Sequence, residues 1–444
     1  MNQTTPRPAR AAPGAAAVLL ALAGASAHAQ TADTGTRPTD TAAAPSPYYL
    51  GASQGFTHDS NVYRIPSGAG DNYSSTSLLA GFDQRISRQR VFGTAGVSLN
   101  RYQDEKTLDN TSYDLAAGLV WETLYNLSGT VDATLDRHLS APAATVGLPP
   151  ATRNLAERKS VNGVARWGGV SLFTLEGTLG YSALDYSAPE YVSSESRQEN
   201  GGLGLYYHPS APLRLGVAVR FDRTRTPQAF LQPDGTYLPN QTQGRHLDLL
   251  ASYELDDRLE VGGRLSYTRQ TNSSAGSDAD FSGVTGILRL AYRPTARLAL
   301  NAVASRRPGF DSGRYGSGFL AGDTPPGTTP SPAATATSGL YENNRLTNSL
   351  DLGARFEATA KINVSAGLNW SRARIASTLT AGGVVGTAAV VDEFHTFTLG
   401  ATYAIARPWL LGCDLSHDKR DVSGAVAYSY KATSIGCSAR FTWR

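Results

Sequence analysis

The chain has 444 residues, of which 40 are basic and 37 acidic, so its formal net charge is +3. Two of the basic residues, Arg7 and Arg10, lie in a segment that we expect to be removed, which leaves 38 against 37 and a net charge of +1. A balance this close excludes the strongly basic surface with which nucleic-acid-binding proteins hold phosphates, so we expect no nucleic-acid partner.

The N-terminal 29 residues have the features of a secretory signal peptide. A basic start is followed by an apolar run from Ala11 to Gly24 and by the small residues Ala27-His28-Ala29 at a cleavage site. The alternative, a transmembrane anchor, needs about 20 apolar residues, and this run is shorter. We therefore predict export with removal of residues 1–29, and a disordered periplasmic leader over residues 30–47, which are rich in Thr, Ala and Pro.

Beyond the leader, apolar and polar side chains alternate with a period of two. In residues 213–222 the apolar members are Leu213, Leu215, Val217, Val219 and Phe221, and charged or small residues occupy the positions between them. A helix would repeat its apolar residues every three or four positions instead. The same alternation recurs in 127–136, 173–181 and 362–371, so we predict strands with one apolar and one polar face.

Tight turns and longer connections alternate along the chain. Short turns are expected near residues 87–89, 124–126, 167–169, 209–211, 256–257, 293–295, 358–360 and 406–408. Longer polar or Gly/Pro-rich segments are expected at 140–153, 188–196, 226–243, 272–278, 307–344 and 376–386. Outer-membrane barrels have short periplasmic turns and long extracellular loops. We therefore predict an all-β fold over residues 48–444, a transmembrane antiparallel up-and-down β-barrel of about 18 strands, with 16 as the alternative.

A soluble β-sandwich is the competing fold, because its strands alternate too. Two observations count against it. The predicted strands run to about 11–14 residues, longer than the usual strands of globular sheets. Tyr and Trp also gather near predicted strand ends, as in the aromatic girdles of membrane barrels; they are Tyr48, Tyr49, Trp121, Trp167, Tyr206, Tyr207, Trp409, Tyr428, Tyr430 and Trp443. The expected location is the outer membrane of a Gram-negative bacterium, with its lipid as a partner.

The last ten residues form an amphipathic strand that ends in aromatic residues. Ile435, Cys437, Ala439, Phe441 and Trp443 share one face. Such an ending resembles the signal that barrel-assembly machinery recognises, so this machinery is an expected partner. The usual final aromatic residue is here penultimate, because Arg444 follows it.

The two cysteines, Cys413 and Cys437, fall on the apolar parity of the last two predicted strands. A symmetric hairpin that pairs them would be centred at residue 425, where the segment 421–425 supplies turn residues. Directly opposed residues of a non-hydrogen-bonded pair lie about 4.5 Å apart at Cα, which is close to disulfide range. We predict a disulfide in the last hairpin; two free thiols facing lipid are the alternative.

No motif for catalysis or metal binding is recognisable. The seven histidines are scattered without ligand spacing, and there is no GxSxG elbow or phosphate loop. We predict no catalytic centre, no metal and no cofactor. A barrel-embedded hydrolase stays open as an alternative, since residues from different strands can meet inside a barrel.

The polar parity of the predicted strands carries charges of both signs. Most of these should neutralise each other across strands, and together they would line a polar conduit. Mixed charge suits neutral or weakly charged hydrophilic solutes, sugars among them. The predicted pore-lining residues are Asp132, Asp136, Glu176, Arg214, Arg220, Asp222, Asp248, Glu254, Glu260, Arg264, Arg289, Asp351, Arg355, Asp414 and Arg440.

Two short segments resemble a known family. Residues 51–64 end in Asp59-Ser60-Asn61-Val62-Tyr63-Arg64, which resembles the first strand and following loop of the β-barrel porin 2 family, and residues 436–442 resemble its ending. That family includes EpsL-type outer-membrane proteins of exopolysaccharide operons. The resemblance implies passage or export of an extracellular polysaccharide, with polymer-export components as partners. A general or small-solute porin is the alternative, and a structural or adhesive barrel is a lesser one. From the residues alone, Asp59 and Asn61 are expected to form a turn.

Overall fold

The computed structural model describes residues 47–140, 153–168, 171–231, 236–256, 258–273, 280–312, 342–381, 384–423 and 429–443. The predicted signal peptide, the leader up to residue 46 and the middle of the predicted 307–344 loop lie outside these ranges. Within the described ranges, no helix combines the length and the apolar character needed to cross a membrane.

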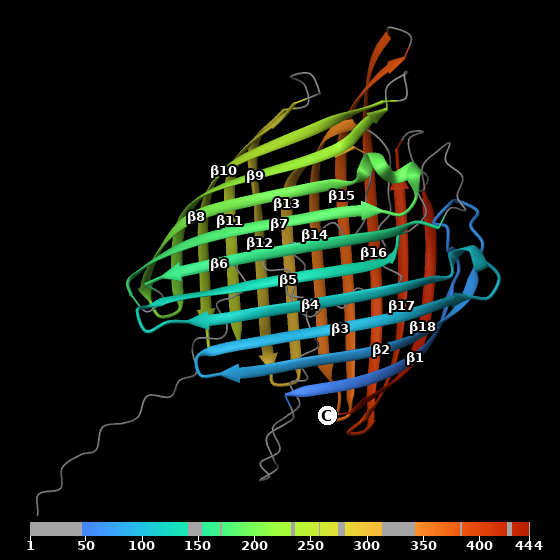
Figure 1. Ribbon diagram of the computed structural model, residues 1–444, viewed down its shortest axis with the longest axis horizontal. Coiled ribbons are helices and arrows are strands. Elements are labelled where there is room, and N and C mark those ends of the chain that lie inside the picture. The colour runs from blue at the N-terminus through green and yellow to red at the C-terminus, as the bar shows by residue number, and fades with distance from the viewer. Residues whose placement is uncertain are drawn as a thin grey trace, which may run out of the picture.

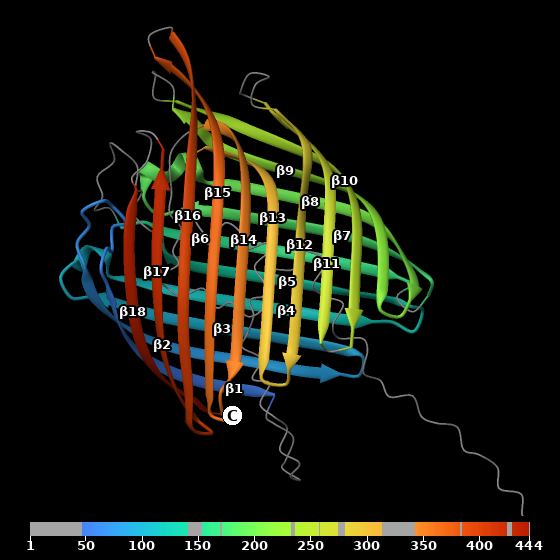
Figure 2. The same cartoon turned by 180° about the vertical axis from the view of Figure 1, so that it is seen from behind.

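Eighteen antiparallel strands form one closed sheet (Figures 1 and 2). Each strand pairs with its neighbours in sequence, and β18 pairs with β1 to close the barrel. This confirms the predicted up-and-down barrel and the larger of the two strand numbers. The strands are β1 (Tyr48–Asp59), β2 (Asp71–Ile86), β3 (Gln89–Tyr102), β4 (Asn110–Glu122), β5 (Leu127–Leu139), β6 (Leu155–Trp167), β7 (Phe173–Tyr186), β8 (Ser196–Ser210), β9 (Leu213–Leu231), β10 (Tyr237–Leu255), β11 (Leu259–Asn272), β12 (Phe281–Thr295), β13 (Leu298–Ser312), β14 (Glu342–Glu357), β15 (Ile362–Ala381), β16 (Val384–Ala406), β17 (Trp409–Val422) and β18 (Tyr430–Trp443). Two short 3₁₀ helices, η2 (Lys106–Leu108) and η3 (Pro189–Ser194), lie in the connections.

Tight turns gather at one rim and longer connections at the other, and β1 begins and β18 ends at the tight-turn rim. Two predicted loops are wrong in extent. The segment 226–243 is mostly strand, since β9 runs to Leu231 and β10 begins at Tyr237. The segment 376–386 is the tip of a long hairpin, because only residues 382 and 383 separate β15 from β16; both views show this hairpin projecting past the rim. The turn expected at 293–295 lies slightly later, between β12 and β13. Polar residues had suggested loops, but a hairpin beyond the membrane needs no apolar face.

The apolar parity of the strands faces outward and stays exposed. On β9, Val217 is 50% and Phe221 55% exposed, whereas Arg214 is 6% exposed. The same holds around the barrel, for example at Leu247 (56%) and Leu179 (73%). A folded protein in water would bury such side chains, so this surface is suited to face lipid, and each strand pairs with a neighbour on both sides in the closed sheet. The fold is therefore a membrane-spanning barrel and not a soluble sandwich.

Outward-facing aromatic residues form a girdle at the tight-turn rim. Trp167, Trp443 and Tyr48 end or begin their strands there and are 63%, 66% and 61% exposed. Three predicted members are wrong, because they face inward: Tyr206 and Tyr430 are each only 4% exposed, and Tyr49 shares the inner parity of β1. Closeness to a strand end predicts the height of a side chain in the membrane but not its face. Tyr428 lies outside the described residues.

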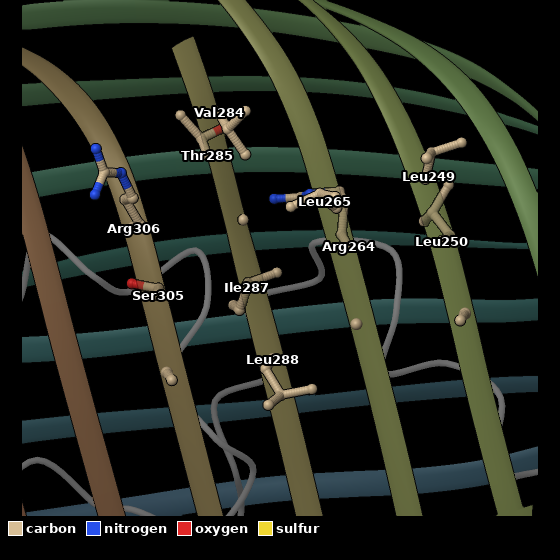
Figure 3. Close-up of a pocket in the computed structure, with 14 residues that line it drawn as sticks. Leu249, Leu250, Arg264, Leu265, Val284, Thr285, Ile287, Leu288, Ser305 and Arg306 are labelled. Atoms are coloured by element: carbon tan, nitrogen blue, oxygen red, sulfur yellow. The ribbon is translucent and has the colours of Figure 1, made fainter.

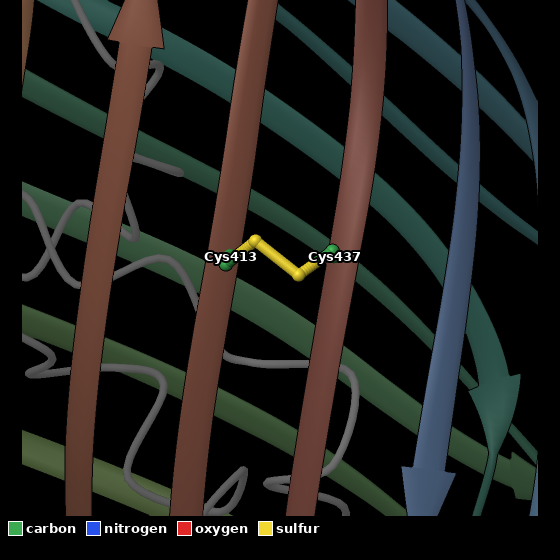
Figure 4. Close-up of a disulfide and its surroundings, with 2 residues drawn as sticks. All are labelled: Cys413 and Cys437. Carbon is green, nitrogen blue, oxygen red and sulfur yellow. A yellow bond between two sulfur atoms is a disulfide. The ribbon is translucent and has the colours of Figure 1, made fainter.

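The last hairpin is cross-linked. Cys413 on β17 lies directly opposite Cys437 on β18, and a disulfide joins them with a Cα–Cα distance of 4.0 Å (Figure 4). Both residues share the outer parity of their strands with Leu411 and Ile435. The bond therefore lies on the outer face of the barrel, near the middle of both strands.

Candidate pore lining and mouth

All fifteen predicted pore-lining residues fall on the inner parity of their strands, opposite to the exposed apolar residues. The structure brings most of them into pairs or small clusters and leaves a few exposed to the lumen. Inward-facing side chains form three groups. One lies near the tight-turn rim and one on the wall of β9 to β12. The third lies at the long-loop rim, the mouth of the barrel, and was not predicted from the sequence.

The first group is centred on Glu176, which is 4% exposed on β7 near the tight-turn rim. Arg166 Nε donates to Glu176 Oε2 at 2.6 Å, and Arg214 lies 3.3 Å from the same oxygen. Tyr206 donates its hydroxyl to Glu176 Oε1 at 2.9 Å, and its ring lies 3.5 Å from the Arg214 guanidinium. Four adjacent strands, β6 to β9, thus share one carboxylate. Glu176 and Arg214 were predicted to face the lumen; Arg166 and Tyr206 were not.

The second group is a band of inward side chains on β9 to β12. Arg220 donates to Asp248 at 3.1 Å, and His246 bridges Asp222 and Thr268, whose hydroxyl lies 2.7 Å from that of Thr285. An acid, a histidine and a hydroxyl in sequence are also the parts of a nucleophilic triad. Thr268 is 0% exposed, so its hydroxyl cannot reach a substrate, and the band is a hydrogen-bonded element of the wall.

The remaining predicted pore-lining residues have different surroundings. Asp132 accepts from Asn162 at 3.0 Å, and Asp351 accepts from Asn369. Asp136 lies 3.4 Å from His138. Glu254 and Glu260 lie directly opposite each other on β10 and β11. Arg264 and Arg289 follow on the inner parity of β11 and β12, whereas Asp414, Arg355 and Arg440 are exposed on the inner face. No cluster of three metal-ligating side chains occurs in the described part of the chain.

The third group lies at the long-loop rim, where the connection between β1 and β2 folds over the inner wall. Arg64, 4% exposed, makes two parallel 2.8 Å hydrogen bonds to Asp59 at the end of β1. The same guanidinium lies 3.8 Å from Asp418 on the inner face of β17. The Arg64 backbone has φ of 54°, a left-handed conformation that is uncommon for a residue with a side chain. Burial alone would lower the pKa of Arg64, but the hydrogen bonds and charge of Asp59 raise it above its ordinary value.

Asn61 connects this loop to β18, the last strand of the chain, through a hydrogen bond. Its side-chain amide donates to the carbonyls of Ile65 at 2.7 Å and of Lys431 at 3.0 Å, the latter on β18. Its backbone N–H donates to Asp59 at 2.9 Å. The prediction that Asp59 and Asn61 form a turn was therefore incomplete. They also anchor a buried arginine and a contact across the junction of β1 and β18.

A second connection, between β3 and β4, packs against this loop. Tyr63, Tyr102 and Leu108 form a small buried cluster, and Tyr63 donates its hydroxyl to Glu105. Burial, followed by the hydrogen bond to Glu105, raises the pKa of Tyr63 to about 12, so the hydroxyl stays protonated and continues to donate. Asp71, 2% exposed, accepts the backbone N–H of Glu105 at 2.8 Å. The blue loops in Figure 1 are thus one packed unit at the mouth.

A further buried ion pair lies beside this unit. Arg420 on β17 makes two 2.9 Å hydrogen bonds to Asp392 on β16, and the side chains are 1% and 5% exposed. Asp418 and Arg420 share the parity of the predicted residue Asp414, so the alternation along β17 was the signal that could have found them. Their partners could not be found without the register of β16 and the path of the β1–β2 loop.

Comparisons with known proteins show similarity in shape only. No protein-family model matches the chain, and no curated protein matches it. The FrpB iron transporter from Neisseria meningitidis is 9% identical, with a TM-score of 0.45 over 94% of this chain and 83% of that one. OpdK from Pseudomonas aeruginosa, solved with vanillate, is 12% identical, with a TM-score of 0.45 over 89% of this chain and 99% of that one. The siderophore receptor PirA from Acinetobacter baumannii is 9% identical, with a TM-score of 0.41 over 90% and 81% of the two chains.

Proposed function

We propose that this protein is a passive outer-membrane channel for large hydrophilic solutes, with an extracellular polysaccharide as its cargo. The main support is that the two faces of the barrel wall differ. The outer face carries exposed apolar side chains, and the inner face is polar, with charges that largely pair within the protein. The rim asymmetry supports the orientation, since long extracellular loops and short periplasmic turns are general in such barrels. The resemblance of residues 51–64 and 436–442 to EpsL-type proteins supports the cargo.

The pairing of inner charges bears on what the lumen favours. Glu176 is shared by two arginines, and Arg220–Asp248 and Arg420–Asp392 are closed pairs. A paired wall presents hydroxyls, amides and neutralised charges, and not a ring of one sign. Such a wall attracts neither cations nor anions strongly, whereas its polar groups can hydrogen-bond to sugar hydroxyls. A general or small-solute porin remains the second candidate, because the same wall would pass any small neutral solute.

Reconstitution into planar bilayers tests the channel. We expect discrete conductance steps with a reversal potential near zero in a potassium chloride gradient, because the inner charges cancel. A barrel without conductance would overturn the proposal and favour a structural or adhesive role. Turnover of lipid or peptide without conductance would favour the hydrolase alternative.

A deletion strain tests the cargo. If the protein exports polysaccharide, we expect the strain to accumulate polymer in its periplasm and to lose surface polymer, as measured by fractionation and sugar analysis. Restoring the gene should restore surface polymer. Normal surface polymer in a strain that lacks the conductance would contradict export and leave the small-solute porin.

A further inference from the structure

Three pairs of basic residues face each other across neighbouring strands on the outer surface of the barrel. Each pair lies in the half of its strands nearer the long-loop rim. Like charges directly opposite each other destabilise a sheet unless a counter-charge is near. The pairs are Arg197 and Arg225, Arg245 and Arg269, and Lys419 and Lys431.

Two of the three pairs have an acidic partner within the protein. Arg197 binds Asp185, and Lys419 lies 2.7 Å from Asp421. Arg245 on β10 and Arg269 on β11 are both exposed, and the described residues offer neither of them an ion pair. Within the described part of the chain, this pair therefore has no counter-charge of its own.

An apolar cavity opens on the same wall (Figure 3), farther along β10 and β11 from the long-loop rim than this arginine pair. Its volume is about 600 Å³, and it extends over β10 to β13. Leu249 and Leu265, which lie directly opposite each other and are each 56% exposed, border it on the outer face. They stand four residues along their strands from Arg245 and Arg269, which is about 13 Å. Gly263 belongs to the lining and leaves room between the larger side chains.

A third arginine borders the cavity from the opposite side. Arg306 on β13 is exposed and pairs across the sheet with Gly286, on the outer parity. The described residues include no acidic partner for Arg306 either. An apolar groove thus has cations above it and beside it, on a surface that faces lipid. A phosphate fits such a site because arginine can bind it through two parallel hydrogen bonds.

We propose that this wall is a binding site for a phosphorylated glycolipid of the outer leaflet. Arg245, Arg269 and Arg306 would hold phosphate on its sugar headgroup, and an acyl chain would occupy the groove below. The lipid of the outer leaflet is the expected occupant because the arginines lie on the long-loop half of the barrel, and this rests on the outer-membrane location proposed above. Binding at this site requires both the arginines and the apolar groove. Non-specific attraction of anions to the long-loop rim would require only the basic residues.

The test is binding of purified lipid A to the intact barrel in detergent, counted by native mass spectrometry across a titration. We expect the double variant R245Q/R269Q to bind about tenfold more weakly, which is the scale of one lost charge-assisted contact. The matched control is R101Q/K159Q. It removes the same charge from exposed outward residues of the opposite wall, where Lys159 lies 2.8 Å from Glu157 and Arg101 lies 3.9 Å from Asp109. Equal loss in both variants would overturn the site.

A groove-filling variant tests the apolar half. A Cβ at Gly263 would meet Leu288 Cδ1 at 3.6 Å and the Ile287 carbonyl at 3.8 Å, both ordinary contacts, so G263L should fold and fill the groove. We expect weaker lipid A binding with arginines intact. Phosphatidylglycerol binding as tightly as lipid A would overturn the glycolipid assignment. All variants should conduct like the wild type, so a failure of channel function and a failure of lipid binding are separable.

Discussion

Replacing Arg64 with alanine is expected to release the β1–β2 loop from the mouth of the barrel. Asp59, 5% exposed, would lose both of its guanidinium hydrogen bonds and remain as a buried, unpaired carboxylate beside Asp418. Breaking a buried ion pair by removing one partner costs about 3–5 kcal/mol. We expect that loss to fall on the loop, seen as fast amide hydrogen exchange over residues 60–70 and as new protease cleavage there in an otherwise intact barrel.

Two further variants separate this effect from a general loss of arginine. Arg101→Ala removes an outward arginine that is 53% exposed and lies 3.9 Å from Asp109, and exposed pairs contribute at most about 1 kcal/mol. We expect it to leave the loop protected. The double variant D59A/R64A removes both charges and should be less damaging than R64A alone. Protection of residues 60–70 that is unchanged in R64A would contradict the role assigned to this ion pair.

Replacing Glu176 with glutamine is expected to destabilise the barrel wall and alter ion selectivity together. Arg166 and Arg214, with side chains 12% and 7% exposed, would lose their shared counter-charge. By the same reasoning as for Arg64, the free energy of unfolding should fall by about 3–5 kcal/mol. Two uncompensated cations on the inner wall should also shift the reversal potential toward anion selectivity. Urea unfolding in detergent and planar-bilayer recording measure the two effects.

The matched control is Asp414→Asn. Asp414 is also an inward acid, but it is exposed and lies outside the cluster, so its replacement should leave stability within about 0.5 kcal/mol of the wild type. Both variants remove one negative charge from the inner face. If E176Q and D414N unfold at the same urea concentration, the shared carboxylate does not hold the four strands together as described.

A structural feature could be predicted from the sequence when it depends only on residues that are close together in the chain. The face of a strand residue depends only on its position, so the alternation around Val217 was enough to place its neighbours inside or outside. The opposition of Cys413 and Cys437 depends on one hairpin with a short connection, so arithmetic on the sequence was sufficient. Tyr206 was misplaced because its position near a strand end was weighed above its parity.

The mouth could not be predicted, because its contacts depend on how the sheet closes. Arg64 reaches Asp418 only because β1 pairs with β18 and β18 with β17. Nothing in the local pattern around Asp59 indicates that register. The sharing of Glu176 by Arg166 and Arg214 likewise requires the relative shift of three strand pairs. Polar composition around residues 376–386 suggested a loop, whereas the strands continue there beyond the membrane.

The β1–β2 loop also bears on the order of folding. Ser60 donates its backbone N–H to Thr433 at 2.9 Å, and Asn61 contacts Lys431, so residues near the start of the barrel are held by its last strand. Contacts so distant in sequence carry the largest loop-closure entropy and form only when the intervening chain is in place. An ordered mouth is thus a late event, available only to a finished barrel. A chain halted before β18 pairs with β1 should have all its earlier hairpins and still lack its mouth.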